Sequence, residues 1–171
     1  GASVTVVPNP DVVDISSTEV RAALAQGGGE DMLPPAVWGY ICREQLYGTH
    51  TDLKHLTPDE LRPVALSYLK PKRMPHVLGT EQEAVRLAER YGADVTKARV
   101  AALLHDCTKK LDMAEQLALC ERDRIPLDEL ERKALKLLHS KTGAAIARDV
   151  FAVDDEVYNA ILYHTTGKPD M

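Results

Sequence analysis

Residues 97–106 read KARVAALLHD, an apolar helical stretch that ends in the pair His105-Asp106. Apolar residues at this density predict a helix that is largely buried. An aspartate at the end of such a helix needs a cation or hydrogen-bond donors, because an unpaired buried carboxylate is costly. An imidazole beside a carboxylate can bind a divalent metal from two directions. This stretch therefore predicts a helical fold with a candidate metal site at a helix end.

Three further histidines mark the ends of apolar helical stretches. His76 precedes one such stretch, while His139 and His164 follow two others. If these ends converge inside a helical bundle, their side chains supply a metal-dependent hydrolase site. A histidine in a helical protein can equally be a packing or surface residue, and that interpretation suits His50 and His55 in their polar linker. Spacing alone leaves both interpretations open, because helix count and composition do not fix which ends meet. The candidate ligands are His76, His105, Asp106, His139 and His164.

The composition is that of an ordinary globular domain. Of 171 residues, 44% are hydrophobic and 27% charged, which is enough to form a core. Lysine and arginine number 21 and acidic residues 26, so the net charge of −5 gives no global attraction for nucleic acid. A metal and a few local cations can still attract a small anionic ligand.

Cysteine use and the absence of long apolar runs favour the cytoplasm. The three cysteines, Cys42, Cys107 and Cys120, are odd in number and have no paired spacing, which favours a reducing compartment. No apolar run reaches membrane-spanning length, so we expect no membrane segment. The first residues, GASVTVVP, lack the basic flank and long apolar stretch of a signal peptide.

From Thr57 onward the pattern is helical throughout. Thr57 to Glu60 form a capping box with proline at the first helical position, and Pro63 is expected to bend that helix. The predicted fold is therefore mainly α, a helical bundle from about residue 52. Further helices are expected over residues 76–91, 94–106, 112–123, 127–150 with a break near His139, and 154–164.

The N-terminal part has a different pattern. Residues 4–7, VTVV, predict a strand, a capping box at Ser16 to Glu19 opens a helix, and Pro35 opens another that ends at Gly48. A lone strand has nothing to pair with, so residues 1–48 are interpreted as the α/β end of a larger domain. Such a remnant would pack on the helical domain, pair with another copy or be mobile, and the exposed strand edge favours pairing, as in a homodimer. Residues 49–56 are a predicted linker to a domain over 57–171.

Four segments of the second part resemble one enzyme family. They are RMPHVLG (73–79), AALLHDCTK (101–109), LHSKTGA (138–144) and HTTG (164–167). In this order they resemble the HD-domain phosphohydrolases, and within them the YqeK-like symmetrical bis(5'-nucleosyl)-tetraphosphatases. The resemblance implies hydrolysis of a dinucleoside tetraphosphate into two nucleoside diphosphates, such as two ADP from diadenosine tetraphosphate.

The resemblance also assigns residues. His76, His105 and Asp106 would be core metal ligands, whereas His139 and His164 would support a second metal or contact phosphates. Family members often carry iron, as one or two ions, and other divalent transition metals substitute. Lys109 would reach a phosphate oxygen beside the catalytic pair, although a solvated lysine next to Lys110 is an equally open interpretation. Further candidates for substrate binding in the same pocket are Arg73 and Thr166.

One feature departs from the family pattern. The family supplies another aspartate ligand from a helix after the His-Thr-Thr-Gly segment, and neither Asp170, Asp154 nor Asp155 matches that position. We therefore expect a domain that is incomplete at its C-terminus, binds metal weakly and hydrolyses slowly. A non-catalytic nucleotide- or metal-binding module is the alternative.

Residues 4–48 resemble the C-terminal end of bacterial nicotinate-nucleotide adenylyltransferases, enzymes of NAD biosynthesis with a Rossmann-like nucleotidyltransferase fold. The resemblance rests on residues 14–21, 33–34 and 40–41. It implies that a helix N-terminus and an arginine hold nucleotide phosphates; a plain capping box is the alternative. The family's catalytic histidine motif does not occur, so we expect an excerpt of a fusion protein rather than an adenylyltransferase. The residues to which the phosphate-binding role would transfer are Ser16, Ser17, Thr18 and Arg21.

Overall fold

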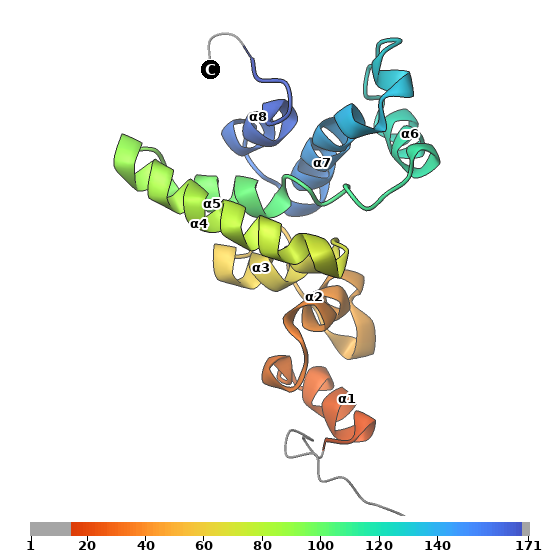
Figure 1. Ribbon diagram of the computed structural model, residues 1–171. Coiled ribbons are helices and arrows are strands. Elements are labelled where there is room, and N and C mark those ends of the chain that lie inside the picture. Colours follow the sequence, from red (N-terminus) through yellow and green to blue (C-terminus); the bar gives the residue numbers. More distant parts are fainter. Residues whose placement is uncertain (1–14, 169–171) are drawn as a thin grey trace, which may run out of the picture.

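The computed structural model describes residues 15–168, and this part consists of helices and connecting loops without a strand (Figure 1). The mainly α class is confirmed. The predicted strand at residues 4–7, and with it the proposed pairing edge, lies outside the described residues. The α-helices are α1 (Ser17–Ala25), α2 (Pro35–Glu44), α3 (Pro58–Ser67), α4 (Met74–Tyr91), α5 (Val95–Leu104), α6 (Met113–Arg122), α7 (Leu135–Phe151) and α8 (Asp155–Tyr163); short 3-10 turns are η1 (Glu30–Met32), η2 (Leu46–Gly48), η3 (Pro71–Arg73) and η4 (Glu131–Lys133).

Helix α5 lies at the centre of the fold. It packs against α4 on one side and against α3, α7 and α8 on others, and Leu103 and Leu104 are fully buried. Asp94 caps its N-terminus by accepting a hydrogen bond from the Lys97 amide, and the helix ends at Leu104. The expected helix over 94–106 is thus confirmed to within two residues. His105 and Asp106 follow at the point where the chain leaves the helix, inside the core.

The buried carboxylate of Glu81 links helices α3, α4 and α5 through ion pairs. Glu81 on α4 is 4% exposed and accepts hydrogen bonds from Arg62 of α3 at 2.8 and 2.9 Å and from Arg99 of α5 at 3.0 Å. Two guanidinium groups compensate the cost of burying one carboxylate. This ion-pair network fixes α4, which carries His76, relative to α5, which leads to His105.

Helices α2 and α3 cross at very short range. A Cβ atom added to Gly39 would lie 1.9 Å from the carbonyl oxygen of Pro63, so only glycine permits this approach. Cys42 belongs to the same apolar core as Leu61 and Val64. The domain boundary at residue 49 stays a prediction, but α2 packs as part of the bundle. The capping boxes at Ser16 and Thr57 are both present, as expected.

One expected helix begins later than predicted. The stretch 127–150 does not form a single helix with a break near His139, because α7 starts at Leu135. Before it, Asp128 and Glu131 exchange side-chain to backbone hydrogen bonds of 3.0 and 2.8 Å, which favour a turn. Ala134, with φ −117° and ψ 79°, then interrupts the helical backbone. His139 therefore lies in the second turn of α7 rather than at a helix break.

Candidate metal centre

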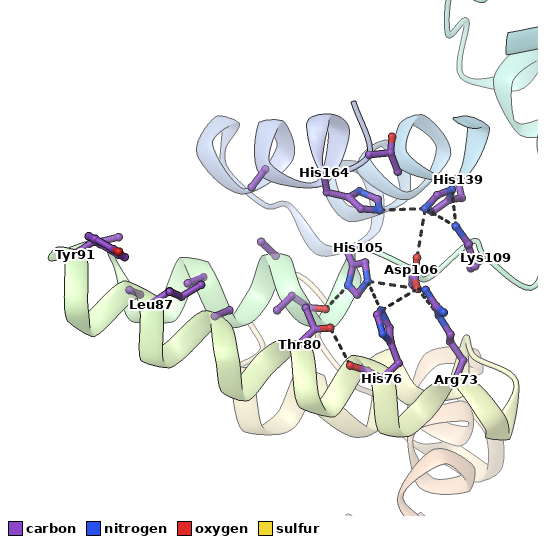
Figure 2. Close-up of a pocket in the computed structure, with 18 residues that line it drawn as sticks. Arg73, His76, Thr80, Leu87, Tyr91, His105, Asp106, Lys109, His139 and His164 are labelled. Carbon is purple, nitrogen blue, oxygen red and sulfur yellow. Dashed lines mark hydrogen bonds and ion pairs between the residues drawn. The ribbon is translucent and has the colours of Figure 1, made fainter. Parts of the chain in front are cut away.

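The five predicted ligands converge at one place, where the ends of α4, α5, α7 and α8 meet (Figure 2). They form two groups, each with two histidines and one carboxylate, and in each group the nitrogen and oxygen atoms lie within 4.8 Å of one another. Asp106 belongs to both groups. The first contains His76 and His105, and the second contains His139 and His164.

The Oδ2 atom of Asp106 faces the first group. It lies 3.4 Å from His105 Nε2 and 3.7 Å from His76 Nε2, and these two nitrogens are 3.3 Å apart. Arg73, at the end of η3, donates a hydrogen bond from Nε to the same oxygen at 2.6 Å. One carboxylate oxygen is thus shared between a guanidinium group and two imidazoles.

The Oδ1 atom of Asp106 faces the second group. It lies 3.4 Å from His139 Nε2, which is 3.0 Å from His164 Nε2. Among the residues that the structure describes, this buried oxygen has no hydrogen-bond partner. A buried carboxylate oxygen without a partner is costly, and a cation would satisfy it.

Three of the histidines are oriented in the same way. The Nδ1 atoms of His105, His139 and His164 each lie 2.7 Å from the carbonyl oxygen of the residue three positions earlier. Because a carbonyl oxygen only accepts, each Nδ1 carries the proton and donates it. In this tautomer each ring, when neutral, presents its Nε2 lone pair to the centre. Backbone carbonyls commonly fix the tautomer of metal-binding histidines in this way.

The residues present fit a divalent metal. Imidazole nitrogens and a carboxylate are the donors that iron, manganese and zinc accept, and two histidines with one carboxylate are the donor set of many non-haem iron sites. Converging lone pairs and an unsatisfied buried carboxylate oxygen are otherwise unfavourable neighbours. The geometry of both groups supports the prediction that these five residues bind a metal.

The electrostatics keep the ligands in their metal-binding forms. Burial favours the neutral form of Asp106, but hydrogen bonds and charge from His105 and Arg73 outweigh it and hold the carboxyl pKa well below its usual range. Burial, the Lys109 charge and neighbouring His164 lower the pKa of His139 to about 4. Asp106 is therefore ionised and His139 neutral near pH 7, as metal coordination requires.

A cavity of about 760 Å³ opens from this centre. Figure 2 shows that the ligands occupy one end, and that Leu87 and Tyr91 of α4 lie toward the other. Between these ends the wall is mostly alanine. Lys109 lines the cavity, and its Nζ atom lies 2.9 Å from His139 Nε2. A volume of this size accommodates one nucleotide. The alanines that line it are Ala84, Ala88, Ala93, Ala98, Ala101, Ala102 and Ala160.

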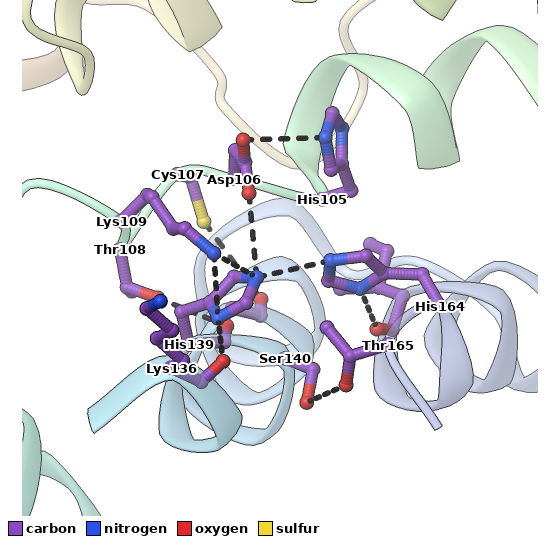
Figure 3. Close-up of polar contacts among 12 residues, drawn as sticks. His105, Asp106, Cys107, Thr108, Lys109, Lys136, His139, Ser140, His164 and Thr165 are labelled. Carbon is purple, nitrogen blue, oxygen red and sulfur yellow. Dashed lines mark hydrogen bonds and ion pairs between the residues drawn. The ribbon is translucent and has the colours of Figure 1, made fainter. Parts of the chain in front are cut away.

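A buried polar network holds the loop that carries Asp106. Thr108 bonds Thr142 of α7 through the two hydroxyls at 2.8 Å and donates to the carbonyl of His139 at 3.0 Å. Thr142 also bonds Gln116 Oε1 of α6 at 2.8 Å. Figure 3 shows the contact of Thr165 with Ser140, at 3.4 Å. Sequence reasoning missed these positioning residues. The one signal in the sequence was that Thr108 and Thr142 lie close to the predicted ligands Asp106 and His139.

Other predicted residues are placed differently. Arg73 lines the cavity, whereas Thr166 is exposed, bonds the Gly167 carbonyl and is absent from the cavity wall, where Thr165 stands instead. Asp154 caps α8 and pairs with Lys97, and Asp155 is an exposed residue of the first turn of α8. Asp170 lies outside the described residues.

The predicted N-terminal nucleotide-binding residues lie at the opposite end of the molecule from the cavity, on α1 or at its start (Figure 1). The backbone amide and hydroxyl of Ser16 both donate to the Glu19 carboxylate, at 2.8 and 2.7 Å. Arg21 lies over the Tyr47 ring. The helix N-terminus is thus capped by its own carboxylate. Ser17 and Thr18 are exposed beside it, so the four residues do not meet the metal centre.

Comparison with known families agrees with this geometry. Residues 73–171, which hold all five predicted ligands, match the HD domain. The chain belongs to the HD domain family. The match begins at Arg73 and so includes α4 to α8.

Curated relatives carry one common name. Proteins from Halalkalibacterium halodurans and Bacillus subtilis, each named symmetrical bis(5'-nucleosyl)-tetraphosphatase, are 37% identical over 115 residues and 36% identical over 104. The matches cover 64% and 60% of this chain and 61% and 55% of the relatives, so the chain spans less than two thirds of their length.

A solved structure has the same fold. It is a predicted HD superfamily hydrolase involved in NAD metabolism from Clostridium acetobutylicum, with 39% identity and a TM-score of 0.63. The match covers 68% of this chain and 62% of the other. In the part of the chain that the structure describes, no helix is both long and apolar enough to cross a membrane.

Proposed function

We propose that the chain is a metal-dependent phosphohydrolase that cuts dinucleoside tetraphosphates symmetrically into two nucleoside diphosphates. The observation that carries the proposal is the pair of His-His-carboxylate groups around Asp106, at the end of a nucleotide-sized cavity. Relatives named symmetrical bis(5'-nucleosyl)-tetraphosphatase support the choice of substrate. The adenylyltransferase alternative gains no support, since the amide and hydroxyl of Ser16 already donate hydrogen bonds to the Glu19 carboxylate.

The metal ligands divide into two sets. His76 and His105 would hold one ion and His139 and His164 another, with the two oxygens of Asp106 shared between them. A divalent cation supplies Lewis acidity: it lowers the pKa of water toward neutrality and offsets charge on the attacked phosphate. Iron is the proposed ion, because each set consists of two histidines and one carboxylate.

The remaining side chains act on the substrate. The Lys109 ammonium group lies at the edge of the centre and is placed to donate to a phosphate oxygen, offsetting its negative charge. Arg73 holds Asp106 in position through both Nε and Nη2, and its Nη1 leaves donors for a phosphate. The alanine wall of the cavity gives an apolar surface for a nucleoside.

Product analysis tests the proposal. The purified protein, loaded with Fe²⁺ or Mn²⁺, is incubated with diadenosine tetraphosphate, and the products are separated by chromatography. ADP as the sole product is expected, and Asp106→Ala should abolish its formation while the exposed Asp155→Ala variant retains it. Equal amounts of AMP and ATP would show an asymmetrical enzyme, and no product with any divalent metal would favour the non-catalytic module.

We also propose a cytoplasmic location. The cysteines Cys42, Cys107 and Cys120 are free thiols and buried. Buried free thiols are usual in a reducing compartment.

A further inference from the structure

A smaller hollow adjoins the metal centre. It measures about 290 Å³, and Arg73 and Lys109 line both this hollow and the large cavity. These two side chains therefore stand between the metal ligands and the hollow. We call it the basic hollow, because five of its six lining residues are cationic: Leu69, Lys70, Lys72, Arg73, Lys109 and Lys110.

Of the five cations of the basic hollow, Arg73 pairs with Asp106, and the lysines have no carboxylate partner among the described residues. Within residues 15–168, no carboxylate forms an ion pair with Lys70, Lys72 or Lys110, although the whole chain has a net charge of −5. Lys110 is oriented by a hydrogen bond from its Nζ to the Ser67 carbonyl at 3.4 Å. Clustered cations without carboxylate partners form a site for an anion.

The two segments that supply these lysines are ordered by the backbone. Lys72 and Arg73 lie on η3, which begins at Pro71 and is closed by a hydrogen bond from the Arg73 amide to the Lys70 carbonyl at 2.8 Å. Lys109 lies on the turn after α5, where its amide donates to the Asp106 carbonyl at 2.9 Å. Hydrogen-bonded turns next to Asp106 therefore fix the backbone positions of these lysines.

We propose that the basic hollow binds the phosphates of the substrate half that lies beyond the scissile bond. The inference rests on the proposed function, because a symmetrical cut leaves a nucleoside diphosphate on each side of the centre. The alanine-walled cavity suits one nucleoside, and Arg73 and Lys109 flank the reacting phosphates. The other pair of phosphates then extends to Lys70, Lys72 and Lys110, whose ammonium groups are point-charge partners for phosphate oxygens.

Binding to the metal-loaded protein separates this role from catalysis. The ligands are a methylene-bridged, non-hydrolysable diadenosine tetraphosphate and ADP, each titrated by calorimetry. Loss of each exposed lysine–phosphate pair should weaken binding roughly 2- to 5-fold. The triple variant K70A/K72A/K110A should therefore bind the tetraphosphate analogue about 10- to 100-fold more weakly. Its affinity for ADP, which needs one half of the site, should change less than about 3-fold.

Lys54→Ala is the matched control, an exposed lysine outside both cavities, and should leave both affinities unchanged. Equal losses for the two ligands in the triple variant, or no loss for either, would overturn the inference. Selective loss without any ADP production in the product assay would sink the proposed function alone. ADP production without selective loss would sink the basic hollow alone.

Discussion

His139 and His164 point their Nε2 atoms at each other across 3.0 Å, while each Nδ1 is already bonded to a backbone carbonyl. Two neutral imidazoles in this arrangement face each other with lone pairs. Such a contact is favourable only when a cation or a proton lies at the shared point. The Lys109 ammonium group, 2.9 Å from His139 Nε2, is one such cation, and a divalent metal held by both nitrogens would be another.

Replacing Asp106 should empty both groups. Because its two oxygens face different pairs of histidines, Asp106→Asn should remove the single anionic donor from each. Elemental analysis of the purified variant should show metal far below that of the parent protein, with hydrolysis lost in parallel. Asp155→Asn, on the exposed first turn of α8, serves as control. Full metal content in the Asp106 variant would contradict the site.

Replacing one histidine from either group should separate the two ions. His76→Ala removes a ligand of the first group alone, and His139→Ala removes one of the second. If two ions bind, each variant should lose about half of the bound metal, because loss of a ligand strongly weakens its own site. Metal content that falls to zero in both variants would instead indicate one ion held by all the histidines.

The metal-free protein should lose stability between about pH 6.5 and pH 4. The pKa of buried His139 is lowered from 6.5 to about 4, so the unfolded chain binds a proton in this range that the folded chain does not. Stability then rises with pH across the window and is level above it, with up to roughly 3 kcal/mol at stake. Urea denaturation of chelator-treated protein measures this. His139→Gln should reduce the slope, and His76 and His164, whose pKa values burial also lowers, should supply the remainder; an unchanged slope would refute the assignment.

The α2–α3 crossing should tolerate no side chain. Gly39→Ala would place a Cβ against the Pro63 backbone, which cannot move without separating the two helices. We expect a loss of about 3 kcal/mol or more in the free energy of unfolding. In contrast, Gly79→Ala in α4 meets nothing within 4 Å and should stabilise the protein by about 0.5–1 kcal/mol. A mild Gly39→Ala effect would show that the crossing relaxes.

Local signals predicted the helices well. The capping boxes predicted at Ser16 and Thr57 depend on residues three positions apart, and both are present in the structure. The same reasoning failed at residues 127–134. There the Asp128–Glu131 bonds compete with a helix that the apolar pattern favoured.

The composition of the metal centre was predicted, but its arrangement was not accessible from sequence. Spacing placed His76 and His164 correctly at ends of helices, yet which ends meet depends on long-range packing such as the pairing of Glu81 with two arginines. The division of Asp106 between two groups likewise needs three-dimensional positions. The basic hollow was missed because its lysines look like ordinary surface charges in the sequence.

The carbonyl bonds behind His105, His139 and His164 have a consequence for metal exchange. Since helix-end backbone, rather than an ion, sets the direction of each ring, the donors stay aligned when the ion leaves. Imidazole and carboxylate donors accept iron, manganese and zinc, so the supply of each metal in the cell, together with the Irving–Williams order of affinities, decides which one binds. The ion found in the protein should then follow cellular supply, so growth in manganese- or zinc-rich medium should change the metal without changing the fold.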